Sequence, residues 1–170
     1  IKCDNSNSTS NYDGFSSANL TFTYNYLNRL DNNTVMKENV LSTSASYVNN
    51  ILTVKLERNV LCSSGNAAPA QSGFYQLTDN GLKLMVMTDK DTSKYVYPCR
   101  IENTFVIVSL NLSLNENFKI HYQNENGEMV DLEECVYNNM LYGDQEVFKS
   151  QDLNSVCICN SGKVSCKDLQ

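Results

Sequence analysis

Apolar and polar residues alternate strictly through the second part of residues 105–114, which read Phe-Val-Ile-Val-Ser-Leu-Asn-Leu-Ser-Leu. From position 108 onward, Val or Leu alternates with Ser or Asn, a period of two that predicts a β-strand with one face on a core and the other in water. Asn111 on the polar side begins an Asn-Leu-Ser sequon, and N-glycosylation requires an exposed asparagine. Residues 105–108 are apolar on both sides, as expected for a strand covered on both faces. The pattern predicts a central strand of a secreted, two-layered β protein.

The same alternation recurs at residues 20–26, where apolar or aromatic side chains occupy the even positions. A sequon begins at Asn19, again on the polar side, so we expect a strand with an exposed glycosylation site. Residues 41–58 predict a β-hairpin around Asn49-Asn50, because asparagine tolerates the positive φ of tight turns. A two-residue loop predicts the pairs Tyr47 with Leu52, Ala45 with Val54 and Thr43 with Leu56.

Two Asn-Gly pairs predict two further hairpins. At Asn80-Gly81, a two-residue type I′ turn places apolar residues opposite one another. The pairs that this turn predicts are Asp79 with Leu82, Leu77 with Leu84 and Tyr75 with Val86. At Asn126-Gly127, a two-residue loop would place Ile120 opposite Glu133. We therefore expect a three-residue loop at 125–127, with its glycine in the left-handed region. The pairs that it predicts are Tyr122 with Val130 and Ile120 with Leu132.

The remaining segments are less regular. Residues 95–101 alternate as a strand, but Pro98 cannot donate a ladder hydrogen bond, which predicts an edge or bulged position. Residues 63–73 are predicted to form a long loop, and residues 144–150 could form one or two helical turns. We expect an all-β protein: a two-layer antiparallel β-sandwich with disulfides and at most short helical turns.

Residues 1–18 contain few apolar side chains, and we expect them to be a linker, the tail of a preceding cysteine-rich module. The β-sandwich domain is predicted to span residues 19–170, a length that suits one domain. The chain starts with Ile and shows no signal segment. We therefore expect a processed protein or a piece of a longer one.

Seven cysteines accompany four sequons, at Asn7, Asn19, Asn32 and Asn111. This combination indicates secretion, an oxidising compartment and disulfide bonds. A turn at residues 161–162 would bring Cys157 within disulfide distance of Cys166. The other downstream cysteines allow three pairings, which the sequence leaves open; they are Cys62, Cys99, Cys135 and Cys159. Cys3 lies far upstream, so we expect it to belong to the preceding module and to make no bond within the domain.

The net charge is −6 and the pI is near 4.7, which bears on the class of partner. Nucleic acid is a poor partner, because its phosphates repel an acidic protein. Basic partners are favoured, because a negative potential attracts them; alternatively, the charge only keeps a secreted protein soluble. No apolar run approaches the roughly 20 residues that span a bilayer, so we expect no membrane segment.

Few residues suggest catalysis or metal binding. His121 is the only histidine, and its polar neighbours favour a solvated side chain over a partner for a nucleophile. Zinc bound by Cys157, Cys159 and Cys166 would lack a fourth ligand, and disulfides compete for these thiols. Two carboxylates could serve a glycosidase, although the chain has no Trp to form a sugar platform. We expect no enzyme, no cofactor and no metal.

Acidic residues crowd around the second Asn-Gly hairpin. Five lie within ten residues and two follow: Glu125, Glu128, Asp131, Glu133, Glu134, Asp144 and Glu146. One interpretation is a solvated hairpin tip, whose charges prevent edge-to-edge pairing of strands. The other is a docking surface for a basic protein.

The chain as a whole resembles a known family. The features that carry the resemblance are the Asn- and Tyr-rich strands, the spacing of Cys62, Cys99 and Cys135, and the ending Cys-Ile-Cys-Asn-Ser-Gly-Lys-Val-Ser-Cys-Lys-Asp-Leu-Gln. They resemble the SECRET domain, the C-terminal domain of poxvirus tumour-necrosis-factor receptor homologues of the cytokine response modifier B and D type. The resemblance covers the chain from Cys3 onward, with Cys3 placed like the last cysteine of the receptor-like repeats.

The resemblance implies a β-sandwich that binds chemokines, within a secreted decoy whose preceding repeats bind tumour necrosis factor. Chemokines are strongly basic, which agrees with the acidic charge of the chain. From charge and strand pattern, the expected binding residues are Glu125, Glu128, Asp131, Glu133, Tyr95 and Tyr97. Further candidates are the strand at 20–26 and the loop at 63–73. The alternatives are a non-catalytic adhesion or structural ectodomain module and a secreted hydrolase that uses two carboxylates.

Overall fold

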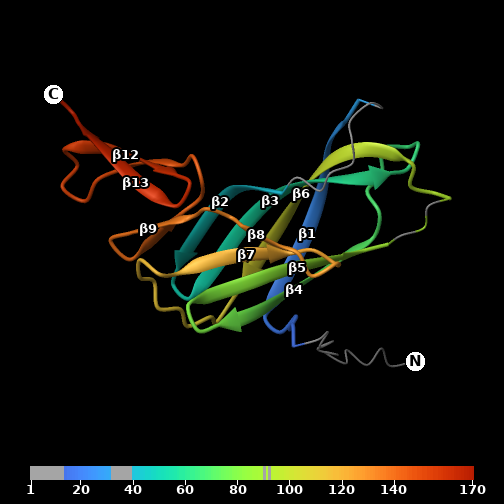
Figure 1. Ribbon diagram of the computed structural model, residues 1–170, viewed down its shortest axis with the longest axis horizontal. Coiled ribbons are helices and arrows are strands. Elements are labelled where there is room, and N and C mark those ends of the chain that lie inside the picture. Colours follow the sequence, from blue (N-terminus) through green and yellow to red (C-terminus); the bar gives the residue numbers. More distant parts are fainter. Residues whose placement is uncertain (1–13, 32–39, 90, 92) are drawn as a thin grey trace, which may run out of the picture.

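The computed structural model of the chain describes residues 14–31, 40–89, 91 and 93–170 (Figure 1). All regular structure in these residues is β-strand. Two four-stranded sheets pack face to face, and two smaller sheets follow towards the C-terminus. The chain is therefore an all-β sandwich with disulfide bonds, as its alternating sequence predicts.

The first sheet has the strand order β1-β6-β3-β2 and is antiparallel throughout. Its strands are β1 (Leu20–Arg29), β6 (Tyr97–Ile107), β3 (Ile51–Cys62) and β2 (Leu41–Val48). The second sheet has the order β4-β5-β7-β8. Its strands are β4 (Gln71–Thr78), β5 (Gly81–Thr88), β7 (Lys119–Gln123) and β8 (Met129–Asp131). Strands β5 and β7 run parallel, because the chain between them crosses to the first sheet and forms β6.

Alternate side chains of the two sheets fill the space between them. Leu52, Val54 and Leu56 of β3 are fully buried, and so are Leu82 and Leu84 of β5. The intervening residues of β3 are half-buried, so burial along the strand follows the period of two. Full burial of one such side chain stabilises the fold by about 1.5–3 kcal/mol, which makes this core the main source of stability.

Two small sheets lie at the end of the sandwich where the C-terminus emerges (Figure 1). They consist of β9 (Cys135–Tyr137) with β10 (Met140–Tyr142), and of β11 (Val147–Lys149), β12 (Ser155–Asn160) and β13 (Lys163–Asp168). Gly143 lies against β2, where a Cβ would come within 2.8 Å of the Ser44 Cα. A glycine is needed there because the two backbones approach closely.

The central strand predicted at 105–114 is correct only in its first part. β6 does lie between β1 and β3, but it ends at Ile107 and only one of its faces is fully buried. Beyond β6 the alternation of burial shifts by one residue: Val108 and Ser109 are both exposed, Ser109 has a positive φ (56°), and Leu110 is buried. Val108 therefore does not share the inward face of Leu110, although the pattern predicted that it would. In the described chain no strand pairs with residues 110–114. The Tyr47 hydroxyl supplies the missing bonds, donating to the Leu110 carbonyl (2.7 Å) and accepting from the Leu112 amide (3.1 Å).

The segment 95–101 was predicted to lie at an edge or to be bulged. The edge position is wrong, because the segment leads into β6 inside the sheet, but its pairing with β1 does shift register between Tyr26 and Asn28, opposite Ile101 and Arg100. Pro98 is the second residue of β6, next to Cys99, where the pairing with β1 ends. A proline at the start of a strand removes little of the ladder, so an interior strand tolerates it there.

The hairpin at Asn49-Asn50 is confirmed close to its turn, where both asparagines have positive φ (52° and 60°). The predicted pairs Tyr47 with Leu52 and Ala45 with Val54 are present. Beyond Ser44 a bulge shifts the register, so that Leu56 pairs with Ser42 and not with Thr43. A bulge adds one residue to one strand, and a run of small polar residues gives no sign of it.

The register predicted at Asn80-Gly81 is wrong by two residues. The loop is Asp79-Asn80, and Tyr75 pairs with Leu84. A shift of two leaves the same side chains facing the core, so the alternation cannot detect it. Gly81 is required for a different reason: a Cβ there would lie 1.8 Å from the carbonyl oxygen of Lys119 on β7.

The three-residue loop predicted at 125–127 is confirmed. Tyr122 pairs with Val130, and Leu132 donates its amide to the Ile120 carbonyl (3.0 Å). The loop glycine has φ +83°, the left-handed conformation that this loop type needs.

Three disulfides join six cysteines: Cys62–Cys99, Cys135–Cys159 and Cys157–Cys166. The last is the predicted cross-strand bond, and the first two settle the pairing that the sequence leaves open. They link β3 to β6 and β9 to β12. Three disulfides fit an extracellular or secretory environment. The expectations for Cys3 and for the sequons at Asn7 and Asn32 fall outside the described residues.

Packed structure begins before the expected boundary at residue 19. Phe15 is buried against Phe74 and Met85, and Ser16 pairs with Tyr75 on β4. Residues 14–18 therefore pack on the sandwich, although we expected a linker over 1–18.

Two local expectations are also corrected. Residues 144–150 form a turn and β11, not helical turns, and the loop predicted at 63–73 ends where β4 begins. β11 pairs with β12, the next strand, and the β4–β5 hairpin extends back to Gln71, which pairs with Thr88. Local composition shows neither pairing.

Candidate binding surface

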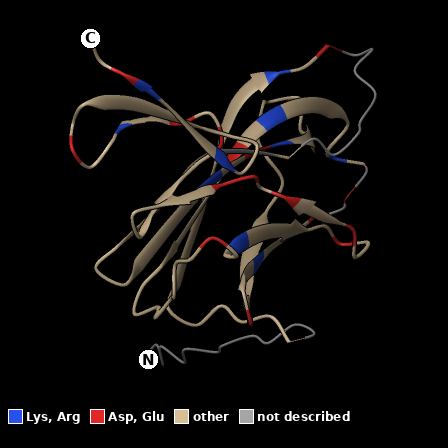
Figure 2. Ribbon diagram, turned by 60° about the vertical axis from the view of Figure 1, so that its left-hand side comes forward, with Lys and Arg blue, Asp and Glu red and all other residues tan. Residues whose placement is uncertain are grey.

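The acidic residues noted in the sequence lie on the β7–β8 loop, on β8 and on the connections before β9 and β11. Between Lys119 and Lys149 the chain has seven carboxylates and no lysine or arginine. Across the described chain, most lysines and arginines lie within strands, whereas most acidic residues lie in loops and turns (Figure 2). Negative charge is thus concentrated in the connections, where a ligand can reach it.

The Asn124 side chain organises the loop that carries Glu125 and Glu128. Its Oδ1 accepts hydrogen bonds from the amides of Asn126 (3.0 Å) and Glu128 (2.9 Å), and its Nδ2 donates to Glu128 Oε2 (2.9 Å). Glu128 is exposed, with its carboxylate held in place. Glu125 instead turns inward, where its Oε1 accepts the Thr88 amide (2.8 Å) and fastens the loop to β5.

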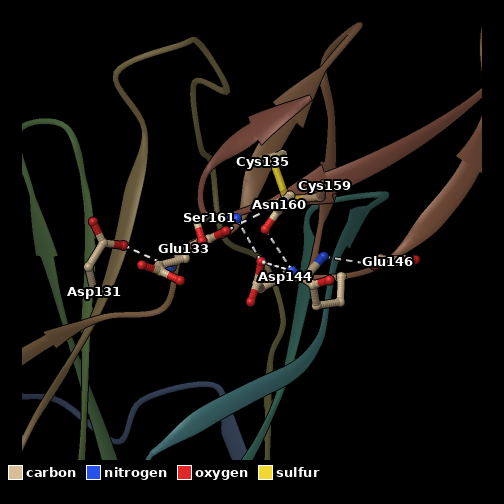
Figure 3. The surroundings of a disulfide bond; sticks show 10 residues. Asp131, Glu133, Cys135, Asp144, Glu146, Cys159, Asn160 and Ser161 are labelled. Carbon is tan, nitrogen blue, oxygen red and sulfur yellow. Dashed lines mark hydrogen bonds between the residues drawn. A yellow bond between two sulfur atoms is a disulfide. The ribbon is translucent and has the colours of Figure 1, made fainter. Parts of the chain in front are cut away.

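Asp131 and Glu133 are exposed on either side of the turn that leads into β9 (Figure 3). Asp131 Oδ1 accepts the Glu133 amide (2.8 Å), and Glu133 has φ +57°. The Glu133 carbonyl accepts the amide of Gly162, at the tip of the β12–β13 hairpin (2.9 Å). The backbone that presents both carboxylates is therefore fixed.

Asp144 and Glu146 come from a separate connection, between β10 and β11. They lie, like Asp131 and Glu133, around the Cys135–Cys159 disulfide (Figure 3). Asp144 Oδ1 accepts the Ser161 amide and Glu146 Oε2 accepts the Gly143 amide, each at 2.8 Å. Both side chains are half-buried. We call five of these residues the acidic surface: Glu128, Asp131, Glu133, Asp144 and Glu146.

Glu134 differs from these residues because only 2% of it is exposed. Its Oε1 accepts the Ile120 amide (2.6 Å), and its Oε2 has no hydrogen-bond partner among the described residues. Burial raises the pKa of Glu134 from 4.5 to about 7, against backbone hydrogen bonds that lower it. Glu134 lies two residues after buried Leu132 and so continues its inward position. In the sequence, the surrounding acidic residues concealed this signal.

A cavity of about 320 Å³ lies between the two sheets, at the end away from the C-terminal sheets. Arg58, 3% exposed, contributes to its lining. The Arg58 Nε donates to Asn103 Oδ1 (2.7 Å), and Nη1 donates to the Tyr122 hydroxyl (2.9 Å). Arg58 was not among the predicted site residues, although it interrupts the series of apolar residues at the even positions of β3.

The predicted binding residues divide between these two places. Glu125 and buried Tyr95 line the cavity, whereas Glu128, Asp131 and Glu133 belong to the acidic surface. Tyr97 belongs to neither, because Arg29 covers its ring, with Cζ 4.0 Å from the ring centre.

The residues considered for catalysis or metal binding lie on β7 and in the C-terminal sheets. His121 is half-buried on β7, opposite Asp131. The three cysteines considered for zinc are bonded in disulfides. Within the described part of the chain, no three His, Cys, Asp or Glu residues are grouped to hold a metal ion. The same residues form no helix long and apolar enough to cross a membrane.

Comparison with known proteins gives no family. No family model, curated protein or solved structure matches the chain. The acidic surface and the cavity are therefore the features that bear on its function.

Proposed function

We propose that this domain is a secreted, non-catalytic decoy that binds basic chemokines and keeps them from their receptors. The observation that carries the proposal is the acidic surface, in which Asp131, Glu133, Asp144 and Glu146 lie around the Cys135–Cys159 disulfide (Figure 3) and Glu128 lies on the neighbouring β7–β8 loop. No lysine or arginine separates these five residues in the sequence. The resemblance to the SECRET domain favours the same class of ligand.

Charge acts on such an encounter before contact. At physiological salt the Debye length is about 8 Å, so several carboxylates together attract a basic protein where a single one has little effect. Bonds from backbone amides already hold Asp131 and Glu146, which reduces the side-chain freedom lost on binding. The bound ligand would have its basic surface covered, and that surface is the one needed for its receptor or for glycosaminoglycans.

The test neutralises the exposed part of the acidic surface with Glu128→Gln, Asp131→Asn and Glu133→Gln. An amide side chain keeps an acceptor oxygen, so residue 131 can still accept the hydrogen bond from the amide of residue 133. The matched control, Asp31→Asn, Asp152→Asn and Asp168→Asn, removes three carboxylates elsewhere. Association with an immobilised basic chemokine is measured by interferometry at several salt concentrations.

The surface variant is expected to associate about tenfold more slowly at low salt and to show a weaker salt dependence, because exposed charges act mainly on the association rate. The control is expected to change the rate less than about twofold. Equal rates for the surface variant, the control and the unmodified domain would remove the acidic surface from the mechanism. Absence of binding to every member of a chemokine panel would refute the function itself.

A further inference from the structure

The cavity between the sheets has a lining unlike that of the acidic surface. Its apolar wall consists of Val60, Leu61, Pro69, Val86 and Tyr95. Its volume of about 320 Å³ is at the lower end of the roughly 300–1,000 Å³ of small-molecule sites. The space suits one long side chain better than a larger ligand.

Arg58 forms a rigid base for this cavity. Besides its bonds to Asn103 and Tyr122, its Nη2 donates to Gln71 Oε1 (3.0 Å) and Thr88 Oγ1 (3.3 Å). The guanidinium thus joins β3 and β6 of one sheet to β4, β5 and β7 of the other. Because it is buried and bonded on several sides, Arg58 shapes the cavity but offers little surface to a ligand.

The rim of the cavity is acidic. Asp89, Asp91 and Glu125 all line it, and with Arg58 the lining carries a formal charge of −3 + 1 = −2. Hydrogen bonds from the Ser93 side chain and backbone lower the pKa of Asp91, which keeps this carboxylate ionised. Lys94 lies just outside, with Nζ 5.3 Å from the centre of the Tyr95 ring.

We propose that this cavity receives a lysine or arginine side chain of the protein ligand, with the aliphatic stem on the apolar wall and the charged head at the rim carboxylates. The inference rests on the proposed function, since a basic ligand supplies the side chain. Positive charge on Arg58 keeps the head at the rim, where Asp89 and Asp91 are exposed. Long basic side chains bury their stems in this way.

The first experiment uses the domain alone, with methyl-labelled valine and leucine, and follows NMR shifts during titration with N-acetyl-arginine methylamide. N-acetyl-citrulline methylamide, of the same shape but uncharged, is the control ligand. The arginine compound is expected to shift the methyl signals of Val60, Leu61 and Val86, with a dissociation constant on the order of 1–100 mM for so small a ligand. Citrulline should shift them at least about threefold less at equal concentration. Equal shifts with both compounds, or none, would overturn the proposal.

The second experiment links the cavity to the protein ligand through Asp89→Asn with Asp91→Asn. Asparagine preserves the Oδ1 acceptors that Asp91 and Ser93 amides use, so the turn should persist. Asp79→Asn with Glu116→Gln is the matched control, because Asp79 precedes β5 and Glu116 precedes β7, both away from Thr88. Chemokine affinity should fall about three- to tenfold in the rim variant and less than about twofold in the control.

The two proposals fail in different ways. Unchanged chemokine affinity in the rim variant would overturn the cavity as an anchor and leave the proposed function standing. No chemokine binding by the unmodified domain, together with a selective arginine shift, would refute the proposed function and support the cavity as a cation site.

Discussion

At the scale of single residues, the two charged side chains that are buried in the described part of the chain matter most. Arg58 and Glu134 both occupy inward positions of an alternating segment, so the pattern contained their location. Charged residues are rarely buried without partners, so the sequence grouped Glu134 with the acidic run and gave no reason to single out Arg58. The exposed carboxylates followed the expected rule, whereas the inward turn of Glu125 depends on the Thr88 amide of another strand.

Glu134 should make stability depend on pH in a defined direction. Its native pKa of about 7 exceeds its ordinary 4.5, so between these values the unfolded chain loses the proton while the native chain keeps it. The stabilising contribution is complete below pH 4.5 and is lost as pH rises through 7, by roughly 3 kcal/mol at about 1.4 kcal/mol per pKa unit. Asp131 and Lys119 also act on this carboxyl, the first raising and the second lowering its pKa.

The check is urea unfolding of the unmodified protein and Glu134→Gln from pH 5 to 8. Glutamine can accept the Ile120 amide but does not titrate. As pH rises, the unfolding free energy of the unmodified protein should therefore fall relative to that of Glu134→Gln. A difference that is constant across this range would show that Glu134 ionises normally.

At the scale of elements, turn chemistry predicted some registers and missed others for physical reasons. The 125–127 loop was found because an alternative register opposed Ile120 to an acidic residue. At Asp79-Asn80 two registers differ by two residues and bury the same side chains, so the sequence could not distinguish them. The glycine that suggested a turn residue is needed instead for contact with β7.

Gly81→Ala should destabilise the protein by about 2–4 kcal/mol, because the new methyl group collides with the Lys119 backbone. Lys119 cannot move away without losing the hydrogen bond that its amide donates to the Asn80 carbonyl (2.9 Å). Gly127→Ala is the control: nothing lies within 4 Å of its Cβ position, so only its positive φ should cost about 1 kcal/mol. Equal midpoints in thermal or urea unfolding would contradict the close approach of β5 and β7.

The Cys135–Cys159 bond should stabilise the attachment of the C-terminal sheet. It spans 24 residues of sequence, so removing it with Cys135→Ala and Cys159→Ala should cost about 3 kcal/mol. Hydrogen exchange should accelerate in β11, β12 and β13 and remain slow in β3 and β5. Removal of Cys157–Cys166, which spans nine residues, should cost less; a larger effect there would show that the hairpin itself holds the sheet.

At the scale of the whole molecule, the sequence predicted the class of fold but not the path of the chain. Alternation and turn signals were enough for a two-layer β-sandwich. The parallel pairing of β5 with β7 requires about thirty intervening residues to visit the other sheet, and no local pattern reports such a crossover. The cavity depends on the same long-range arrangement and was likewise not predicted.

The described sequons should place glycans at one end of the sandwich, away from the cavity. Asn19 and Asn111 are exposed, and the Asn19 carbonyl accepts the Val108 amide (3.0 Å). The same end exposes Val48, Ile51 and Val108, apolar residues that glycans can shield. Mass spectrometry of protein from a eukaryotic host should find both sites occupied.

Thr21→Ala with Ser113→Ala, which removes both sequons, should increase self-association without changing chemokine affinity. Light scattering and interferometry would measure the two effects. Reduced chemokine affinity would place the ligand at the glycosylated end and contradict the cavity as its anchor.

The interleaving of the two sheets has a consequence for proteolysis. Each sheet contains strands from before and after the connection at residues 89–96, and the Cys62–Cys99 bond bridges that connection. Trypsin can cut after exposed Lys94, yet both fragments would keep strands in both layers. A nicked molecule should therefore run as one particle on a sizing column and separate into two pieces only when it is both reduced and denatured. A cut in the connection between two separate domains releases them from each other, whereas a cut at Lys94 would leave this protein assembled.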